Sequence, residues 1–210
     1  MLGPRSLLFT PQHPIELSTT IQANGLLCIR RNAIAHWGMA STNRDSISPK
    51  AIIMDRSHLE SRIDTYAAGG KLLINAYAGL TRSQLLAVPI PGTWSLQQIA
   101  IHLFDSDLIA SDRMKRIAAM EHPLLIGYDE SAFCRLPGTN ELDAHQACNI
   151  FAQCRLMTAT VLRSLPDESF ARYGIHNAAG KVTLAEMIDS YIDHLDGHLA
   201  HATKKRAMVS

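Results

Sequence analysis

The sequence predicts an all-α protein built as a four-helix bundle. Apolar residues recur with a helical period from Met54 to the end of the chain. Helix-start signals precede three of the periodic segments, and no segment after Met54 alternates in the manner of a strand. The chain has 210 residues, 47% of them hydrophobic, which is sufficient for one domain with a real core plus an appendage.

Residues 1–53 differ in character from the rest of the chain. They mix Pro, Ser, Thr and Asn with scattered apolar residues and show no sustained period of 3.6 or 2. We therefore predict two parts. Residues 1–53 form an N-terminal extension, disordered or translated from an upstream start with Met54 as the functional one, and residues 54–210 form the helical bundle.

Four helices are expected, at about residues 57–77, 96–120, 141–164 and 184–204. The first, second and fourth are expected to begin at capping boxes, formed by Ser57 with Glu60, by Ser95 with Gln98 and by Thr183 with Glu186. Trp94 is expected to pack against Ile99. The pair Gly69-Gly70 is expected to bend or loosen the first helix, since each Gly costs about 1 kcal/mol relative to Ala. The third helix is expected to bury one apolar stripe: Ala147, Ile150, Cys154, Met157 and Val161.

Charge and cysteine usage exclude several classes of function. The formal net charge is +1, and the one dense basic run, 204–206, is explained as a favourable helix end, so we expect no nucleic-acid partner. Cys28, Cys134, Cys148 and Cys154 show no C-x-x-C spacing, which suits a reducing cytoplasm. No apolar run approaches the length of a membrane span, so we expect no membrane partner.

The placement of three histidines suggests a metal site. His194 and His198 are four residues apart, which puts both rings on one face of the fourth helix, the face that also carries Met187 and Tyr191. His102, on the flank of the second helix, is the natural third ligand for zinc, nickel or iron. The alternative is that the histidines are hydrogen-bonded core residues, because an i,i+4 pair arises readily by chance among ten histidines.

Two segments carry a family resemblance. Residues 92–103, GTWSLQQIAIHL, resemble the W-S-x-x-x-x-x-x-H-L motif of the DinB/YfiT-like superfamily, and residues 180–199, GKVTLAEMIDSYIDHLDGHL, resemble its closing helix with H-x-x-x-H. The resemblance covers residues 55–204. It implies a four-helix bundle with long crossover connections, often dimeric, and a divalent metal on His102, His194 and His198. Many members have Gln where this chain has His201, which we expect to be a surface residue, although a contact to a ligand or a place among the ligands stays open.

The resemblance implies the reaction less firmly than the site. Members include thiol-dependent transferases and isomerases, and hydrolases assigned as metal-dependent. We therefore expect a metal-dependent S-transferase or hydrolase acting on a small molecule, with a low-molecular-weight thiol as a candidate cosubstrate and a homodimer as the expected assembly. Two alternatives stay open: a non-catalytic metal- or ligand-binding bundle involved in stress response, and a purely structural bundle.

Residues outside the histidine motifs supply further candidates. Glu130, in the long loop after the second helix, is the candidate acid/base, and Tyr128 a candidate hydrogen-bond donor. Arg113 lies three helical turns after His102 on the same face, where it would bind an anionic substrate group or extend outward into solvent. His176 is expected to be a loop residue, with an approach to the pocket as the alternative. Cys134 is a candidate reactive thiol, but no sequence neighbour indicates a lowered pKa.

Overall fold

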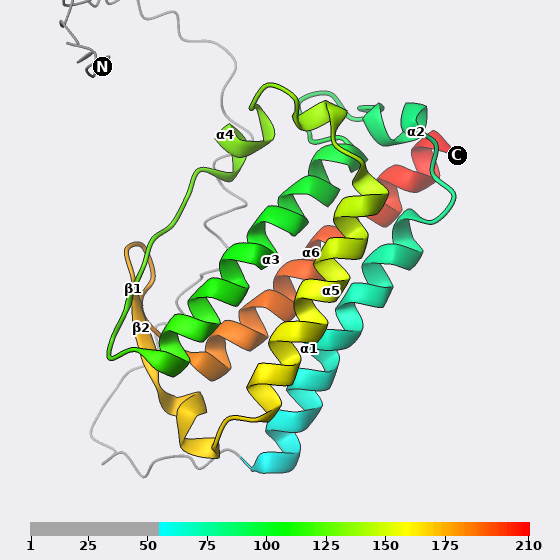
Figure 1. Cartoon of the computed structure of the whole chain (residues 1–210). Helices are drawn as coiled ribbons and strands as arrows, with labels where there is room; N and C mark the ends of the chain where they lie inside the picture. Colours follow the sequence, from blue (N-terminus) through cyan, green and yellow to red (C-terminus); the bar gives the residue numbers. More distant parts are fainter. Residues whose placement is uncertain (1–54) are drawn as a thin grey trace, which may run out of the picture. The chain divides into compact units, whose positions relative to one another are not determined.

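The computed structural model describes residues 55–210, in which four long helices lie side by side (Figure 1). They are α1 (Arg56–Tyr77), α3 (Leu96–Ala119), α5 (Ala144–Arg163) and α6 (Leu184–Val209). Helices α5 and α6 each pack against both α1 and α3, which gives a bundle with four interhelical contacts around one core. The four-helix prediction is confirmed. The predicted extension over residues 1–53 lies outside the described residues.

The directions in which consecutive helices run set the length of the segments that connect them. Helices α3 and α5 run the same way, so residues 120–143 must return along the bundle before α5 can begin (Figure 1). This return segment contains β1 (Leu124–Leu125), α4 (Glu130–Cys134) and the 3-10 turn η2 (Thr139–Glu141). It therefore brings the loop residues back beside the first half of α3.

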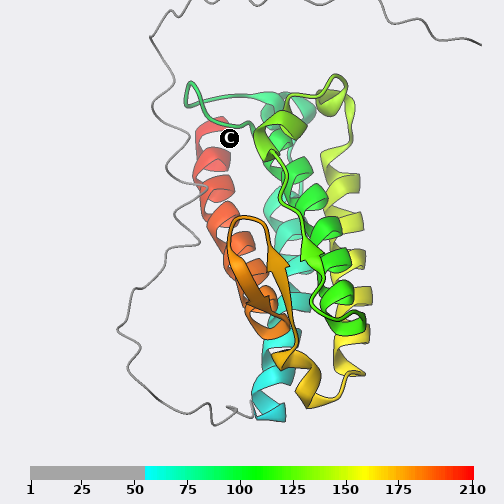
Figure 2. The same cartoon turned by 90° about the vertical axis from the view of Figure 1, so that its left-hand side faces the viewer.

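The connections contain strands that the sequence did not reveal. Strand β1 pairs in parallel with β2 (Tyr173–His176), and β2 pairs antiparallel with β3 (Gly180–Thr183), with Tyr173 opposite Thr183 and His176 opposite Gly180. Figure 2 shows the β2–β3 hairpin along the side of the bundle, where β2 contacts α3 and β3 contacts α6. Strands of two to four residues are too short to show an alternating pattern. The remaining short elements are α2 (Arg82–Leu86) and η3 (Asp167–Ala171).

Two of the three predicted capping boxes are present, those of α3 and α6. The predicted box of Ser57 with Glu60 is wrong, because the N-cap of α1 is Asp55, whose side chain accepts a hydrogen bond from the backbone N–H of Ser57. The Ser95 and Thr183 side chains accept hydrogen bonds from the backbone N–H groups of Gln98 and Glu186, and those side chains accept from the backbone N–H of the capping residues. Arginines from other elements satisfy free carbonyls at three helix C-termini. Arg206 donates to carbonyls at the end of α1, Arg172 to those of α3 and Arg56 to those of α5. The basic run 204–206 thus closes α1 as well as its own helix.

The pair Gly69-Gly70 does not bend α1, which continues unbroken from Arg56 to Tyr77. Both glycines lie at points of close approach instead. A Cβ atom at Gly70 would lie 2.6 Å from the Ala152 Cα atom, and one at Gly69 would lie 2.5 Å from Arg155 Nη1. The absent side chains let α5 pack closely against α1, and this contact offsets the low helix propensity of glycine.

The predicted buried face of α5 is wrong. Ala147 is buried, but Ile150, Met157 and Val161 are 41%, 70% and 39% exposed. The face that packs inward consists of apolar residues interrupted by two polar ones: Ala144, Ala147, Cys148, Phe151, Ala152, Arg155, Thr158, Ala159 and Leu162. The apolar pattern misled because an arginine lies in the middle of the true core face.

A polar layer separates the apolar core into two clusters. At its centre Arg155 Nε donates to Asp107 Oδ1 over 3.0 Å, and both side chains are 1% exposed. Arg155 also donates to the backbone carbonyls of Tyr66 and Tyr191, and the Tyr66 hydroxyl donates to Asp107. The layer therefore joins all four long helices through one buried ion pair.

Candidate metal centre

Three histidine rings converge between α3 and α6. One ring nitrogen from each of His102, His194 and His198 lies within 4.8 Å of the other two. The Nε2 atoms of His102 and His194 face each other at 3.1 Å. Within residues 55–210 this is the one group of three or more His, Cys, Asp or Glu side chains close enough to share an ion. The group forms because His194 and His198, one turn apart on α6, face His102 on α3.

The donor set fits a divalent cation. Burial, followed by the neighbouring His198, lowers the pKa of His102 to about 3, so this ring is neutral at physiological pH and keeps a lone pair on one nitrogen. Zn–N bonds of about 2.0–2.1 Å would place two nitrogens of a tetrahedral ion about 3.3 Å apart. The observed separation of 3.1 Å between the His102 and His194 nitrogens is close to that value.

Two other side chains border the histidines. Glu130 Oε2 lies 3.9 Å from His102 Nε2, and the Glu130 side chain is 37% exposed, so solvent reaches a side chain that borders the histidines. Burial raises the pKa of this carboxyl. The Trp94 ring centroid lies 4.9 Å from that of His102, and the Trp94 ring is parallel to that of His198 at 6.2 Å. Trp94 therefore borders the site. The sequence predicts only that Trp94 packs against Ile99, although its place in the same motif as His102 indicates a position near the histidines.

A family model described as "DinB superfamily" matches residues 66–202, which is more than half of the chain and includes all three histidines. The chain belongs to the DinB superfamily.

Individual relatives within the DinB superfamily carry related names. The chain is 29% identical over 126 residues to "Putative metal-dependent hydrolase YfiT" of Bacillus subtilis, covering 60% of this chain and 71% of the relative. It is 29% identical over 133 residues to "Putative metal-dependent hydrolase OB0782" of Oceanobacillus iheyensis, covering 63% and 77%.

A solved structure matches the fold. Its title reads "YfiT from Bacillus subtilis is a probable metal-dependent hydrolase with an unusual four-helix bundle topology". It superposes with a TM-score of 0.67 at 26% sequence identity, covering 78% of this chain and 90% of that one. The four-helix bundle with long crossover connections is thereby confirmed.

Arg113 of this DinB-superfamily chain points inward, which excludes the outward orientation that we had kept open. It is 7% exposed. Its Nη1 donates to the Tyr191 hydroxyl over 3.2 Å and its Nη2 to the backbone carbonyl of Ile126. The Tyr191 ring in turn packs edge-on against His194, with the centroids 5.8 Å apart. Arg113 therefore joins α3, α6 and the return segment close to the histidines.

The structure also gives the surroundings of the remaining residues singled out in the sequence: Tyr128, His176, Cys134 and His201. Tyr128 lies just before α4, packs against Phe133, and carries a buried hydroxyl. His176 lies in the hairpin, where its Nδ1 accepts from the backbone N–H groups of two residues of the β2–β3 turn. Burial raises the pKa of the Cys134 thiol to about 11, so it stays protonated at neutral pH. His201 is exposed, as expected.

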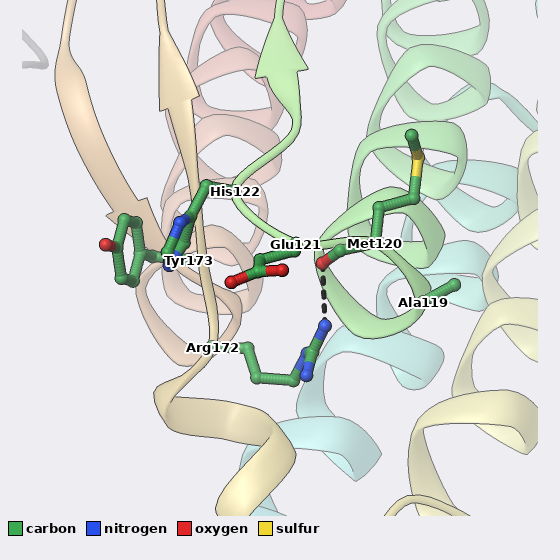
Figure 3. A pocket seen from close by; sticks show the side chains of 6 residues that line it. All are labelled: Ala119, Met120, Glu121, His122, Arg172 and Tyr173. Carbon is green, nitrogen blue, oxygen red and sulfur yellow. Dashed lines mark hydrogen bonds between the residues drawn. The ribbon is translucent and has the colours of Figure 1, made fainter.

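A pocket of about 400 Å³ lies far from the histidines (Figure 3). Its lining comes from the end of α3 and the start of β2: Ala119, Met120, Glu121, His122, Arg172 and Tyr173. The Arg172 guanidinium donates to the Met120 carbonyl there, and the His122 ring stacks on that of Tyr173. Seventeen residues of α3 between His102 and Ala119 correspond to about 26 Å, so this pocket is separate from the candidate centre.

No helix of the described part is long and apolar enough to cross a membrane.

Proposed function

We propose that this DinB-superfamily chain is a metal-dependent hydrolase of a small molecule, with one divalent ion (zinc, nickel or iron) held by His102, His194 and His198. The convergence of three ring nitrogens within 4.8 Å is the observation that supports it most. Three neutral nitrogen donors leave part of the coordination sphere free, which is typical of catalytic metal sites and not of structural ones. The names of the Bacillus and Oceanobacillus relatives agree with this class of reaction.

The residues around the ion have separate roles in this proposal. The bound ion would supply Lewis acidity toward an ester or amide carbonyl. Glu130, close to His102 and partly open to solvent, accepts a proton from the attacking water and returns it to the leaving group. Tyr128 donates a hydrogen bond to the substrate from the same segment. Trp94 covers the histidines on one side and excludes water there.

Elemental analysis of the purified protein tests the metal centre. We expect about one divalent ion per chain in the wild type and much less in His194→Ala, because loss of one of three donors removes most of the affinity. His201→Ala is the matched control, since it removes an exposed histidine from the same helix and should keep the ion. An absence of metal from the wild type, or full metal content in His194→Ala, would contradict the proposal.

The reaction can then be narrowed by assay. Small esters and amides tested with and without a low-molecular-weight thiol distinguish hydrolysis from S-transfer, because only a transferase incorporates the thiol into its product. The thiol cosubstrate and the cytoplasmic location stay predictions from the sequence. Stoichiometric metal without turnover of any substrate would favour the alternative, a binding protein.

We also propose that the chain forms a homodimer through the α5 stripe, defined as Ile150, Cys154, Met157 and Val161. Successive members lie about one turn apart on one side of α5, and three of them are large and well exposed. Two copies could bury their stripes against each other in a two-fold interface. We expect light scattering to give a dimer mass for the wild type and a monomer mass for Met157→Lys, since the interface would then bury two unpaired charges.

The control for this experiment is Asn149→Lys, which adds the same charge on another side of the exposed surface of α5. It should leave the dimer intact. A wild-type monomer at tens of micromolar, or a dimer that persists in Met157→Lys, would show that the stripe is no interface between copies.

A further inference from the structure

Arg113 is a buried cation that makes no ion pair with a carboxylate of residues 55–210, although Glu130 is near enough to interact with its charge. Its side chain is more than nine-tenths buried, yet no carboxylate among residues 55–210 lies within 4.0 Å of it. Its Nε–H group is buried and has no hydrogen-bond partner in the described part of the chain. Each Nη group uses only one of its two N–H donors on the protein. A buried charge is unfavourable unless it is paired and hydrogen-bonded, and within the described part of the chain this guanidinium has no directly paired counter-ion.

The Tyr128 hydroxyl is also buried, and among residues 55–210 it makes no hydrogen bond of good geometry, although the Ser106 side chain lies beside it. It belongs to the same neighbourhood as Arg113. Arg113 Nη2 donates to the backbone carbonyl of Ile126, two residues before Tyr128, and Arg113 Nη1 donates to the Tyr191 hydroxyl. Two buried donors without a hydrogen bond of good geometry therefore lie close together, beside residues that border the histidines.

Arg113 and its neighbours lie further along α3 than the proposed metal centre. Eleven residues separate it from His102 on α3, which is about three turns along the same face. Its side chain leans toward the N-terminus of α3 and reaches Tyr191, whose ring packs on His194. A ligand of several bonds extended along α3 would therefore have one end at the histidines and the other at Arg113.

We propose that Arg113 and Tyr128 form a subsite for a substrate carboxylate, so that the substrate class is small carboxylic acids with a hydrolysable group at the opposite end. This inference rests on the proposed function only for the hydrolysable end of the substrate, which the metal centre would bind. A carboxylate matches the planar guanidinium edge formed by Nε and Nη2, and its single charge compensates the single buried cation. The Tyr128 hydroxyl supplies a further donor.

The first test uses the metal-free protein and therefore does not depend on the metal proposal. Butanoate should raise the melting temperature of the wild type by about 3–6 °C at ten times its dissociation constant, whereas butanamide should not. The shift should disappear in Arg113→Met and persist in Arg116→Met, which removes an exposed arginine one turn further along α3. Equal shifts with the acid and the amide in the wild type would overturn the proposal.

The second test uses zinc-loaded protein and a probe that spans both ends. By calorimetry, 4-mercaptobutanoate should bind the wild type at least about tenfold more tightly than 4-mercaptobutanamide. Arg113→Lys should keep part of this preference and Tyr128→Phe should lower it several-fold. These two variants also decide the question if Arg113→Met fails to fold after losing its contacts to Tyr191 and Ile126. An unchanged preference in both would overturn the subsite, whereas a failure to load zinc would count against the proposed function alone and leave the butanoate test decisive.

Discussion

Replacing Arg155 by Met is expected to destabilise the folded protein by about 3–5 kcal/mol at neutral pH, because it leaves the buried Asp107 carboxyl without its cation. The backbone carbonyls of Tyr66 and Tyr191 also lose their donor, and the guanidinium no longer packs over the rings of Tyr66 and Phe151. Chemical denaturation followed by circular dichroism measures the change.

The control is Arg163→Met, on the same helix. Arg163 pairs with Asp64, but both side chains are exposed, so its loss should cost less than about 1 kcal/mol. The two variants compare a buried and an exposed ion pair of the same chemical type. Equal losses would mean that burial of the Asp107–Arg155 pair has no energetic importance.

The loss in Arg155→Met should depend on pH with a defined sign. Burial raises the pKa of Asp107 to about 6 although Arg155 opposes the shift, so removal of Arg155 raises it further. A raised folded-state pKa gives stability that is present below the unfolded-state pKa and lost as pH rises through the folded-state value. Between about pH 8 and pH 6 the variant should therefore gain stability more steeply than the wild type. The double variant Arg155→Met/Asp107→Asn, which has no carboxyl to titrate, should lose this extra slope and regain part of the stability.

The same ion pair explains which parts of the fold could be predicted from the sequence. Helix starts depend on residues three apart, so the capping boxes at Ser95 and Thr183 are visible in the sequence alone. The inward face of α5 is not visible in this way. It carries Arg155, whose partner Asp107 is on another helix, and the apolar residues that a pattern search selects lie on the opposite, exposed face. Sequence patterns identify a core face poorly where its central residue is an arginine.

The candidate site shows the same division between local and long-range information. His194 and His198 share one helix, and the motif around Trp94 and His102 suggested the third ring, so their meeting could be anticipated. Glu130 reaches His102 only because residues 120–143 return along the bundle, a path that no local signal encodes. The inward orientation of Arg113 likewise depends on Tyr191 and Ile126, which lie on two other segments.

The proximity of Glu130 to His102 leads to the second large expected effect. Replacing Glu130 by Gln should lower the turnover number for a hydrolysed substrate by about 10²–10⁴-fold, because the amide keeps the size of the side chain but accepts no proton. Metal content should stay at the wild-type level, since Glu130 is not one of the three proposed ligands. Steady-state kinetics together with elemental analysis of the same sample measure both quantities.

Paired measurements separate the two roles that a carboxylate next to three histidines can have. A proton acceptor in the reaction affects turnover and leaves the ion bound, whereas a fourth ligand affects the ion and the turnover together. Glu121→Gln is the matched control, because Glu121 also lies in the return segment but lines the distant pocket near the end of α3 (Figure 3), and it should change neither quantity. Loss of metal from Glu130→Gln would make Glu130 a ligand, and full turnover in that variant would remove it from the reaction.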